Sequence, residues 1–184
     1  RNLGGTYANT GQFDKAISIW NKALSLKPSE ERIAKDLVAL YTNTNQFDSA
    51  YSLINRYYKE NERNYPLYNF YLIYGNYYYR NNEISQAIKM SLKALEYEPR
   101  NPGAYNNLGT YYFTIKDYEN AYNSWKKALE LDPNFLDAKM NLFRYYISYK
   151  KNYEKAASLA EELKARGYTI DNSDLEILSK YLKK

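Results

Sequence analysis

The sequence predicts an all-α fold made of about five stacked helical hairpins, and three observations support this prediction. Five stretches of the 184-residue chain resemble one another at a spacing of about 34 residues. Within these stretches, apolar residues recur at the i, i+3, i+4 and i+7 positions of an amphipathic helix. Proline follows several of the stretches, where it would stop a helix. We therefore expect a solenoid in which each hairpin buries its apolar face against its neighbours.

The internal repeat is clearest in the alanines that end each stretch. Ala16 and Ala50 are 34 residues apart, and so are Ala87 and Ala121. Four stretches align without gaps, and the fifth carries one extra residue. The five are NLGGTYANTGQFDKA (2–16), DLVALYTNTNQFDSA (36–50), IYGNYYYRNNEISQA (73–87), NLGTYYFTIKDYENA (107–121) and NLFRYYISYKKNYEKA (141–156).

The fourth unit shows how one hairpin is expected to pack. Its first segment places Gly109 and Tyr112 on one stripe, and its second segment places Ala121 and Trp125 on another. Small residues at Gly109 and Ala121 should let the two helix backbones approach, with Trp125 and Tyr112 filling the space around them. Pro133 follows the second segment and should end it.

The same pattern sets the expected helices along the whole chain. They lie at about 1–9, 13–26, 31–43, 47–60, 66–80, 84–97, 103–114, 118–131, 136–149, 153–165 and 174–182. The last helix should open with a capping box in which Ser173 and Glu176 each accept a backbone N–H. We expect its apolar residues to cover the exposed face of the fifth hairpin. These residues are Leu175, Leu178, Tyr181 and Leu182.

The composition disfavours catalysis. The chain contains neither cysteine nor histidine, which excludes disulfides, thiolate nucleophiles, cysteine-based metal sites and Ser-His triads. The sequence contains no glycine-rich phosphate loop and no pattern of metal-ligating carboxylates. We therefore expect a non-catalytic protein without catalytic residues, cofactor or metal. No apolar run is long enough to span a membrane.

The repeat resembles the tetratricopeptide repeat, in which a small residue, Tyr, aromatic residues, Ala and Pro recur at fixed places in about 34 residues. The resemblance covers about residues 1–167. It implies a right-handed superhelical solenoid of about five helix-turn-helix repeats plus a C-terminal capping helix, in a single domain, 1–184. Because the first helix is shorter than its later copies, we expect a piece of a longer chain. The expected units are 1–30, 31–67, 68–101, 102–135 and 136–167, with the capping helix at 172–184.

The resemblance also implies that the first helix of each repeat lines a concave groove for a peptide or helix of a partner protein. Ten residues lie on these helices at positions expected to face the groove. They are Asn107, Asn141, Asn76, Asn106, Tyr79, Arg80, Phe113, Arg144, Lys35 and Asn43. An asparagine side chain carries both a donor and an acceptor, so a row of them could pair with peptide backbone. The alternative is that these are ordinary solvated polar residues.

The expected function is a protein–protein interaction scaffold, in bacterial envelope assembly, secretion or pilus biogenesis. The clamp that holds chaperone tails in some members of this family is absent, because Ala39 stands where the asparagine after Lys35 is required. One alternative is a regulatory or substrate-recruiting arm of a larger enzyme, and another, less favoured, is an RNA-binding helical repeat. The sequence leaves open whether the protein works in the cytoplasm or in the bacterial envelope.

Overall fold

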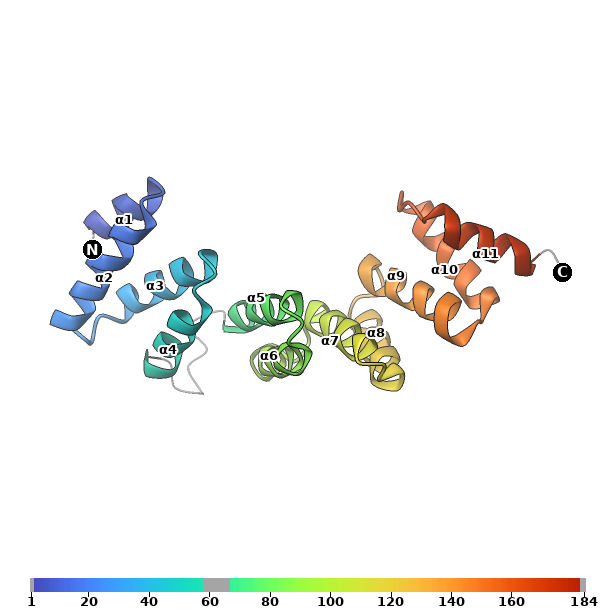
Figure 1. Cartoon of the computed structure of the whole chain (residues 1–184), viewed down its shortest axis with the longest axis horizontal. Coiled ribbons are helices and arrows are strands. Elements are labelled where there is room, and N and C mark those ends of the chain that lie inside the picture. The colour runs from blue at the N-terminus through green and yellow to red at the C-terminus, as the bar shows by residue number, and fades with distance from the viewer. Residues whose placement is uncertain (1, 58–66, 183–184) are drawn as a thin grey trace.

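The computed structural model describes residues 2–57 and 67–182, and this part of the chain is all-helical (Figure 1). The predicted all-α solenoid is confirmed. The predicted helix end at 58–60 and the predicted helix start at 66 lie outside the described residues. The elements are α1 (Asn2–Asn9), α2 (Phe13–Leu26), α3 (Glu31–Asn43), α4 (Phe47–Tyr57), α5 (Leu67–Arg80), α6 (Ile84–Tyr97), α7 (Pro102–Thr114), α8 (Tyr118–Leu131), α9 (Leu136–Tyr145), the π-helical turn η1 (Tyr146–Lys150), α10 (Tyr153–Ala165) and α11 (Asn172–Leu182).

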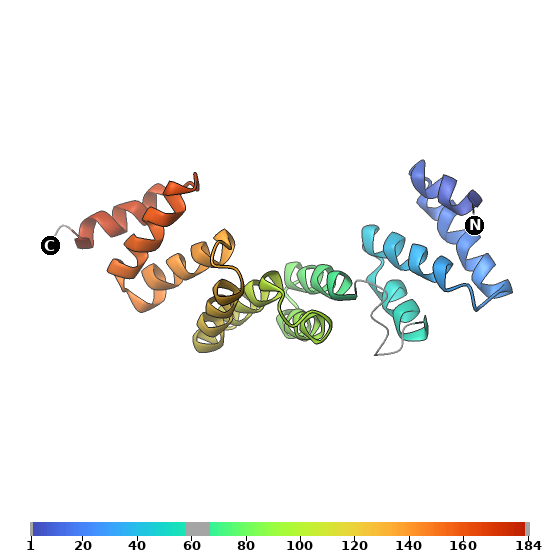
Figure 2. The same ribbon diagram turned by 180° about the vertical axis from the view of Figure 1, so that it is seen from behind.

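Consecutive helices pack as pairs, and the pairs follow one another along an elongated, curved chain whose termini lie at opposite ends (Figures 1 and 2). In Figure 1, α3, α5, α7 and α9 follow one another along the upper, inner side of the curve, with α4 below α3 and α6 below α5. The four upper helices are called the inner helices here. Contacts join α3 to α5, α5 to α7, and α7 to α9, so side chains from successive inner helices can meet.

A tryptophan packed on a glycine sets the spacing of the α7–α8 pair. Trp125 is 2% exposed, and a Cβ added to Gly109 would lie 2.4 Å from its ring. The first pair repeats this arrangement, since a Cβ on Gly4 would lie 2.2 Å from Trp20. Each ring therefore occupies the space in which a larger residue would need its side chain.

The fifth pair departs from this pattern by exchanging the large and small residues. Phe143 stands at the glycine position and Ala160 at the tryptophan position, and both are buried in one cluster. The ring now projects from the first helix of the pair instead of the second. This exchange explains how the pair tolerates a phenylalanine where the first, third and fourth repeats have glycine.

The turn inside each hairpin places one residue in the left-handed region, with φ between 51° and 74°. In the first four turns, the next residue donates its backbone N–H to a repeated tyrosine five positions earlier, as Asp117 does to Tyr112. In the fifth turn, Asn152 donates to Tyr146, six positions earlier. The π-helical turn η1 thus absorbs the extra residue of the fifth unit. The left-handed residues are Gly11, Asn45, Asn82, Lys116 and Lys151.

The last helix covers the fifth pair as expected, but it begins differently. Leu178 is 6% exposed within the apolar cluster of that pair, and the Tyr181 ring stacks on Tyr153 at 4.2 Å. The side chain of Leu182 lies outside the described residues. The predicted capping box is wrong because α11 starts at Asn172, which places Ser173 inside the first turn. The carbonyl preceding the helix, that of Asp171, accepts the first backbone N–H groups instead.

Candidate functional site

The candidate site is a network of asparagine side chains that joins three inner helices. Between α5 and α7, the Asn76 Oδ1 accepts a hydrogen bond from the Tyr111 hydroxyl at 2.7 Å. The same oxygen accepts a second, longer bond from the Asn107 Nδ2 at 3.4 Å. Tyr111 is 1% exposed, so its hydroxyl fixes one end of the network from the core.

Between α7 and α9 a second group of hydrogen bonds centres on Asn141. Its Nδ2 donates to the Asn106 Oδ1 at 2.9 Å and to the Thr110 Oγ1 at 3.3 Å. Asn106, Thr110 and Asn141 are all half-buried, so solvent reaches part of each side chain. The structure therefore brings Asn76, Asn106, Asn107 and Asn141, all predicted site residues, into one surface. These four asparagines, together with Thr110 and Tyr111, are called the asparagine network.

Each asparagine of the network uses only one of its two polar atoms within the described part of the chain. Asn76 and Asn106 accept through Oδ1 and leave their Nδ2 donors without a side-chain or backbone partner there. Asn107 and Asn141 donate through Nδ2, and their Oδ1 acceptors have no side-chain or backbone partner in that part of the chain. The surface thus offers both donors and acceptors to a ligand.

Tyr79 extends the network along α5. Its ring lies 4.9 Å from that of Tyr111, and its hydroxyl accepts a 3.4 Å bond from Thr114. Burial raises the pKa of Tyr111 to about 12, although the neighbouring Ser91 opposes the shift, and Tyr79 adds a smaller increase. Tyr111 therefore remains a neutral donor to Asn76 at physiological pH.

This raised pKa predicts a loss of stability in alkali. The native state holds the Tyr111 proton more tightly than the unfolded chain, whose tyrosines have a pKa of about 10. The stabilisation is therefore complete below about pH 10 and is lost as the pH rises towards 12. Denaturant titrations of the Tyr111→Phe variant between these pH values should show a shallower loss of unfolding free energy than the wild type. If the unfolding free energies of the variant and the wild type fell equally with pH, this role of Tyr111 would be contradicted.

The C-terminal edge of the surface is closed by the segment that follows α10. The Tyr168 hydroxyl donates to Asp137 at 3.0 Å, and Arg144 lies 3.7 Å from the carboxylate of Asp171. Both Asp137 and Arg144 belong to α9. These contacts border a depression of about 330 Å³ that also reaches Asn106 and Asn141. Arg144, a predicted site residue, is thus held at the rim of the network by an exposed ion pair.

The other predicted site residues lie apart from the network. Lys35 and Asn43 are on α3, and Arg80 ends α5 as an exposed side chain. Phe113 packs between α7 and α8, with its ring 5.6 Å from Trp125. Sequence reasoning missed Tyr111, whose place in the site depends on the distance between α5 and α7. The sequence signal that could have indicated it is that Tyr111 lies on the same predicted helix as Asn106 and Asn107.

The part of the chain that the structure describes contains neither a metal-binding cluster nor a membrane-spanning helix. Among residues 2–57 and 67–182, no three His, Cys, Asp or Glu side chains are grouped so that they could hold a metal ion. Within the same residues, no helix combines the length and apolar character needed to cross a bilayer.

Comparisons with known proteins agree with this fold. Models of the tetratricopeptide repeat match residues 2–30 and 102–135. A crystal structure of MamA is 19% identical with a TM-score of 0.66, covering 100% of this chain and 99% of that one. The structure of pilF from Pseudomonas aeruginosa is 20% identical with a TM-score of 0.67, and the match covers 99% of this chain and 82% of that one.

A further MamA structure, from AMB-1, is 25% identical with a TM-score of 0.54 and covers 71% of this chain and 75% of that one. No curated protein sequence matches the chain significantly. The structural matches establish the fold, and the two repeat matches establish the repeat type. The chain therefore carries tetratricopeptide repeats at residues 2–30 and 102–135, on a fold shared with the similar structures.

Proposed function

We propose that the chain is a protein-interaction scaffold that binds an extended segment of a partner protein on the inner helices α5, α7 and α9. The tetratricopeptide repeats and the similar structures support a scaffold of this kind, and this fold is typically a non-catalytic interaction module. The observation that carries the proposal is the asparagine network, whose remaining donors and acceptors lie on one surface.

The chemistry of the network suits peptide backbone. An extended segment presents N–H and C=O groups that have no internal partners and must be satisfied when they leave water. The free Nδ2 atoms of Asn76 and Asn106 could donate to the carbonyls, and the free Oδ1 atoms of Asn107 and Asn141 could accept from the amides. Because the asparagines already hydrogen-bond to one another, their orientations are fixed before binding, which lowers the entropic cost of association.

The finer proposal places this scaffold in bacterial envelope assembly, secretion or pilus biogenesis, which are among the roles of proteins with this repeat. Identification of a partner by affinity capture from the native cell would test it. Recovery of components of one of these systems supports the finer proposal. Recovery of none of them would reject it while leaving the scaffold proposal intact.

The double variant Asn107→Ala/Asn141→Ala tests the binding surface. We expect it to bind peptides on an array at least about ten-fold more weakly than the wild type, which corresponds to about 1.4 kcal/mol. The matched control is Gln86→Ala, which removes an exposed amide from the outer helix α6. Circular dichroism should show that both variants stay folded. An unchanged set of bound peptides in the double variant would reject the surface as the site.

A further inference from the structure

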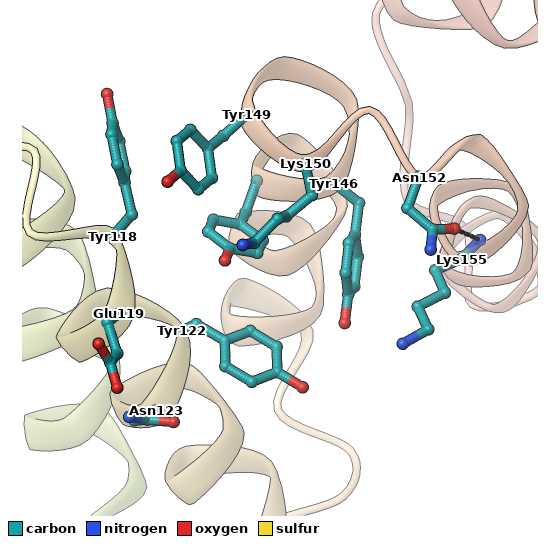
Figure 3. A pocket seen from close by; sticks show the side chains of 10 residues that line it. Tyr118, Glu119, Tyr122, Asn123, Tyr146, Tyr149, Lys150, Asn152 and Lys155 are labelled. Carbon is teal, nitrogen blue, oxygen red and sulfur yellow. Dashed lines mark hydrogen bonds between the residues drawn. The ribbon is translucent and has the colours of Figure 1, made fainter.

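A second candidate site lies away from the inner helices, in a pocket of about 580 Å³ between the start of α8, the turn η1 and the start of α10 (Figure 3). Five tyrosines line it, and we call it the tyrosine pocket. They are Tyr118, Tyr122, Tyr145, Tyr146 and Tyr149. The asparagine network has no residue in this lining, so the two sites can be tested separately.

The pocket owes its shape to the extra residue of the fifth unit. η1 is the π-helical turn that absorbs this residue, and it carries Tyr146, Tyr149 and Lys150. The Tyr149 ring stacks on Tyr118 at 3.8 Å and lies 5.4 Å from Tyr145. Single π-helical turns occur frequently at functional sites because they redirect side chains without ending the helix.

Two lysines give the tyrosine pocket a positive side. The Lys150 Nζ lies 5.1 Å from the centre of the Tyr149 ring, and the Lys155 Nζ lies 5.5 Å from that of Tyr146. Figure 3 shows the Lys150 side chain extending toward the tyrosines and Lys155 approaching from the start of α10. Neither lysine forms an ion pair with a carboxylate in the described part of the chain. Glu119 is the one carboxylate in the lining.

The hydroxyl groups of Tyr145 and Tyr146 remain hydrogen-bond donors. Burial, followed by interaction with Tyr122, raises the pKa of Tyr146 to about 12, and burial also raises the pKa of Tyr145. Neutral phenols and ammonium groups together suit a carboxylate or carbonyl oxygen. The ring faces suit an apolar ring or a flat hydrocarbon surface.

An equivalent pocket earlier in the solenoid provides an internal comparison. Between α4 and α5, Phe47, Tyr77 and Tyr78 occupy the repeat positions of Tyr118, Tyr145 and Tyr146, and they line a pocket of about 430 Å³. That lining contains two carboxylates, Asp48 and Glu83, and no lysine or arginine. The aromatic positions therefore belong to the repeat, whereas the cations distinguish the fifth unit.

We propose that the tyrosine pocket binds a short acidic, proline-rich segment of a partner protein. Proline-rich segments adopt an extended helix without internal hydrogen bonds, and they dock on grooves lined with aromatic rings. Their free carbonyls match the tyrosine hydroxyls, and their acidic side chains match Lys150 and Lys155. The charge of the pocket favours this occupant over a neutral or basic proline-rich segment.

Fluorescence polarisation with three labelled peptides tests the proposal: an acidic proline-rich peptide, the same peptide with lysine for each acid, and the same acidic peptide with alanine for each proline. We expect the acidic proline-rich peptide to bind at least about ten-fold more tightly than either relative. Lys150→Gln/Lys155→Gln and Tyr149→Ala should each weaken its binding about ten-fold or more. Asn107→Ala/Asn141→Ala should leave it unchanged.

The control variant is Lys126→Gln/Lys164→Gln, which removes the same charge from exposed positions outside the pocket. It should bind the acidic proline-rich peptide as the wild type does. If both double-lysine variants lost peptide affinity equally, the attraction would be non-specific and the proposal would be overturned. Equal binding of the proline-free peptide, or no binding of any peptide by the wild type, would overturn it as well.

Discussion

Replacement of Trp125 by alanine should lower the free energy of unfolding by about 3–5 kcal/mol. The ring is 2% exposed, packs on Gly109, and lies 5.6 Å from Phe113 and 6.2 Å from Tyr145. Its removal therefore leaves a cavity that joins α7, α8 and α9. Chemical denaturation followed by circular dichroism measures the loss.

The location of this loss is also predictable. Each repeat of a solenoid contacts only its neighbours, so the destabilisation should spread from the fourth pair without reaching the chain's far end. Hydrogen exchange should rise in α7–α10 and change little in α1–α3. The exposed neighbour Lys126→Ala on the same helix serves as the control. An unchanged free energy of unfolding in Trp125→Ala would contradict the packing of α7 against α8.

Replacement of Gly109 by alanine should also destabilise the protein, although alanine is the better helix former. The added Cβ would lie 2.4 Å from the Trp125 ring, which is too close for the ring to remain in place. Overpacking of this kind costs about 1–3 kcal/mol. The gain in helix propensity, about 0.5–1 kcal/mol, offsets only part of it.

Gly5→Ala is a control with the opposite expected sign. A Cβ at Gly5 would meet nothing within 4 Å, so the same substitution there should stabilise helix α1 by up to about 1 kcal/mol. Thermal denaturation of the two single variants measures both effects. A stabilising Gly109→Ala would contradict the close packing of glycine and tryptophan.

The helices could be predicted because their signal is local and repeated. Apolar spacing and the alanine-to-alanine distance locate the observed helices α1–α11 to within a few residues at the described boundaries. The start of α11 was misplaced because Ser173 and Glu176 match a capping box, whereas the backbone turns into the helix already at Asp171. Local capping patterns compete with neighbouring residues, and the sequence does not decide between them.

The π-helical turn could not be predicted from the extra residue alone. A turn or loop could equally absorb one residue. In the structure, Asn152 caps α10 by accepting the backbone N–H of Lys155 at 3.1 Å, and Tyr146 is packed against the helix cluster. With both ends held, the extra residue widens the helix between them, and the tyrosine pocket forms beside it.

The sequence identified the asparagines of the candidate site but not their pairing. Repeat positions place Asn76, Asn107 and Asn141 on first helices, whereas their hydrogen bonds depend on the distance between neighbouring helices and on side-chain rotamers. The ion pair of Arg144 with Asp171 depends on the path of the segment after α10. Binding of a partner at these residues remains a prediction.

Site-specific photocrosslinking tests the proposed binding surface most directly. A photoreactive residue at Asn76, an exposed position on α5, should crosslink to a captured partner or array peptide. The same residue at Gln86, an exposed position on α6, provides the comparison on the outer side. The account predicts crosslinks from position 76 and few or none from position 86. Crosslinks from position 86 without any from position 76 would contradict it.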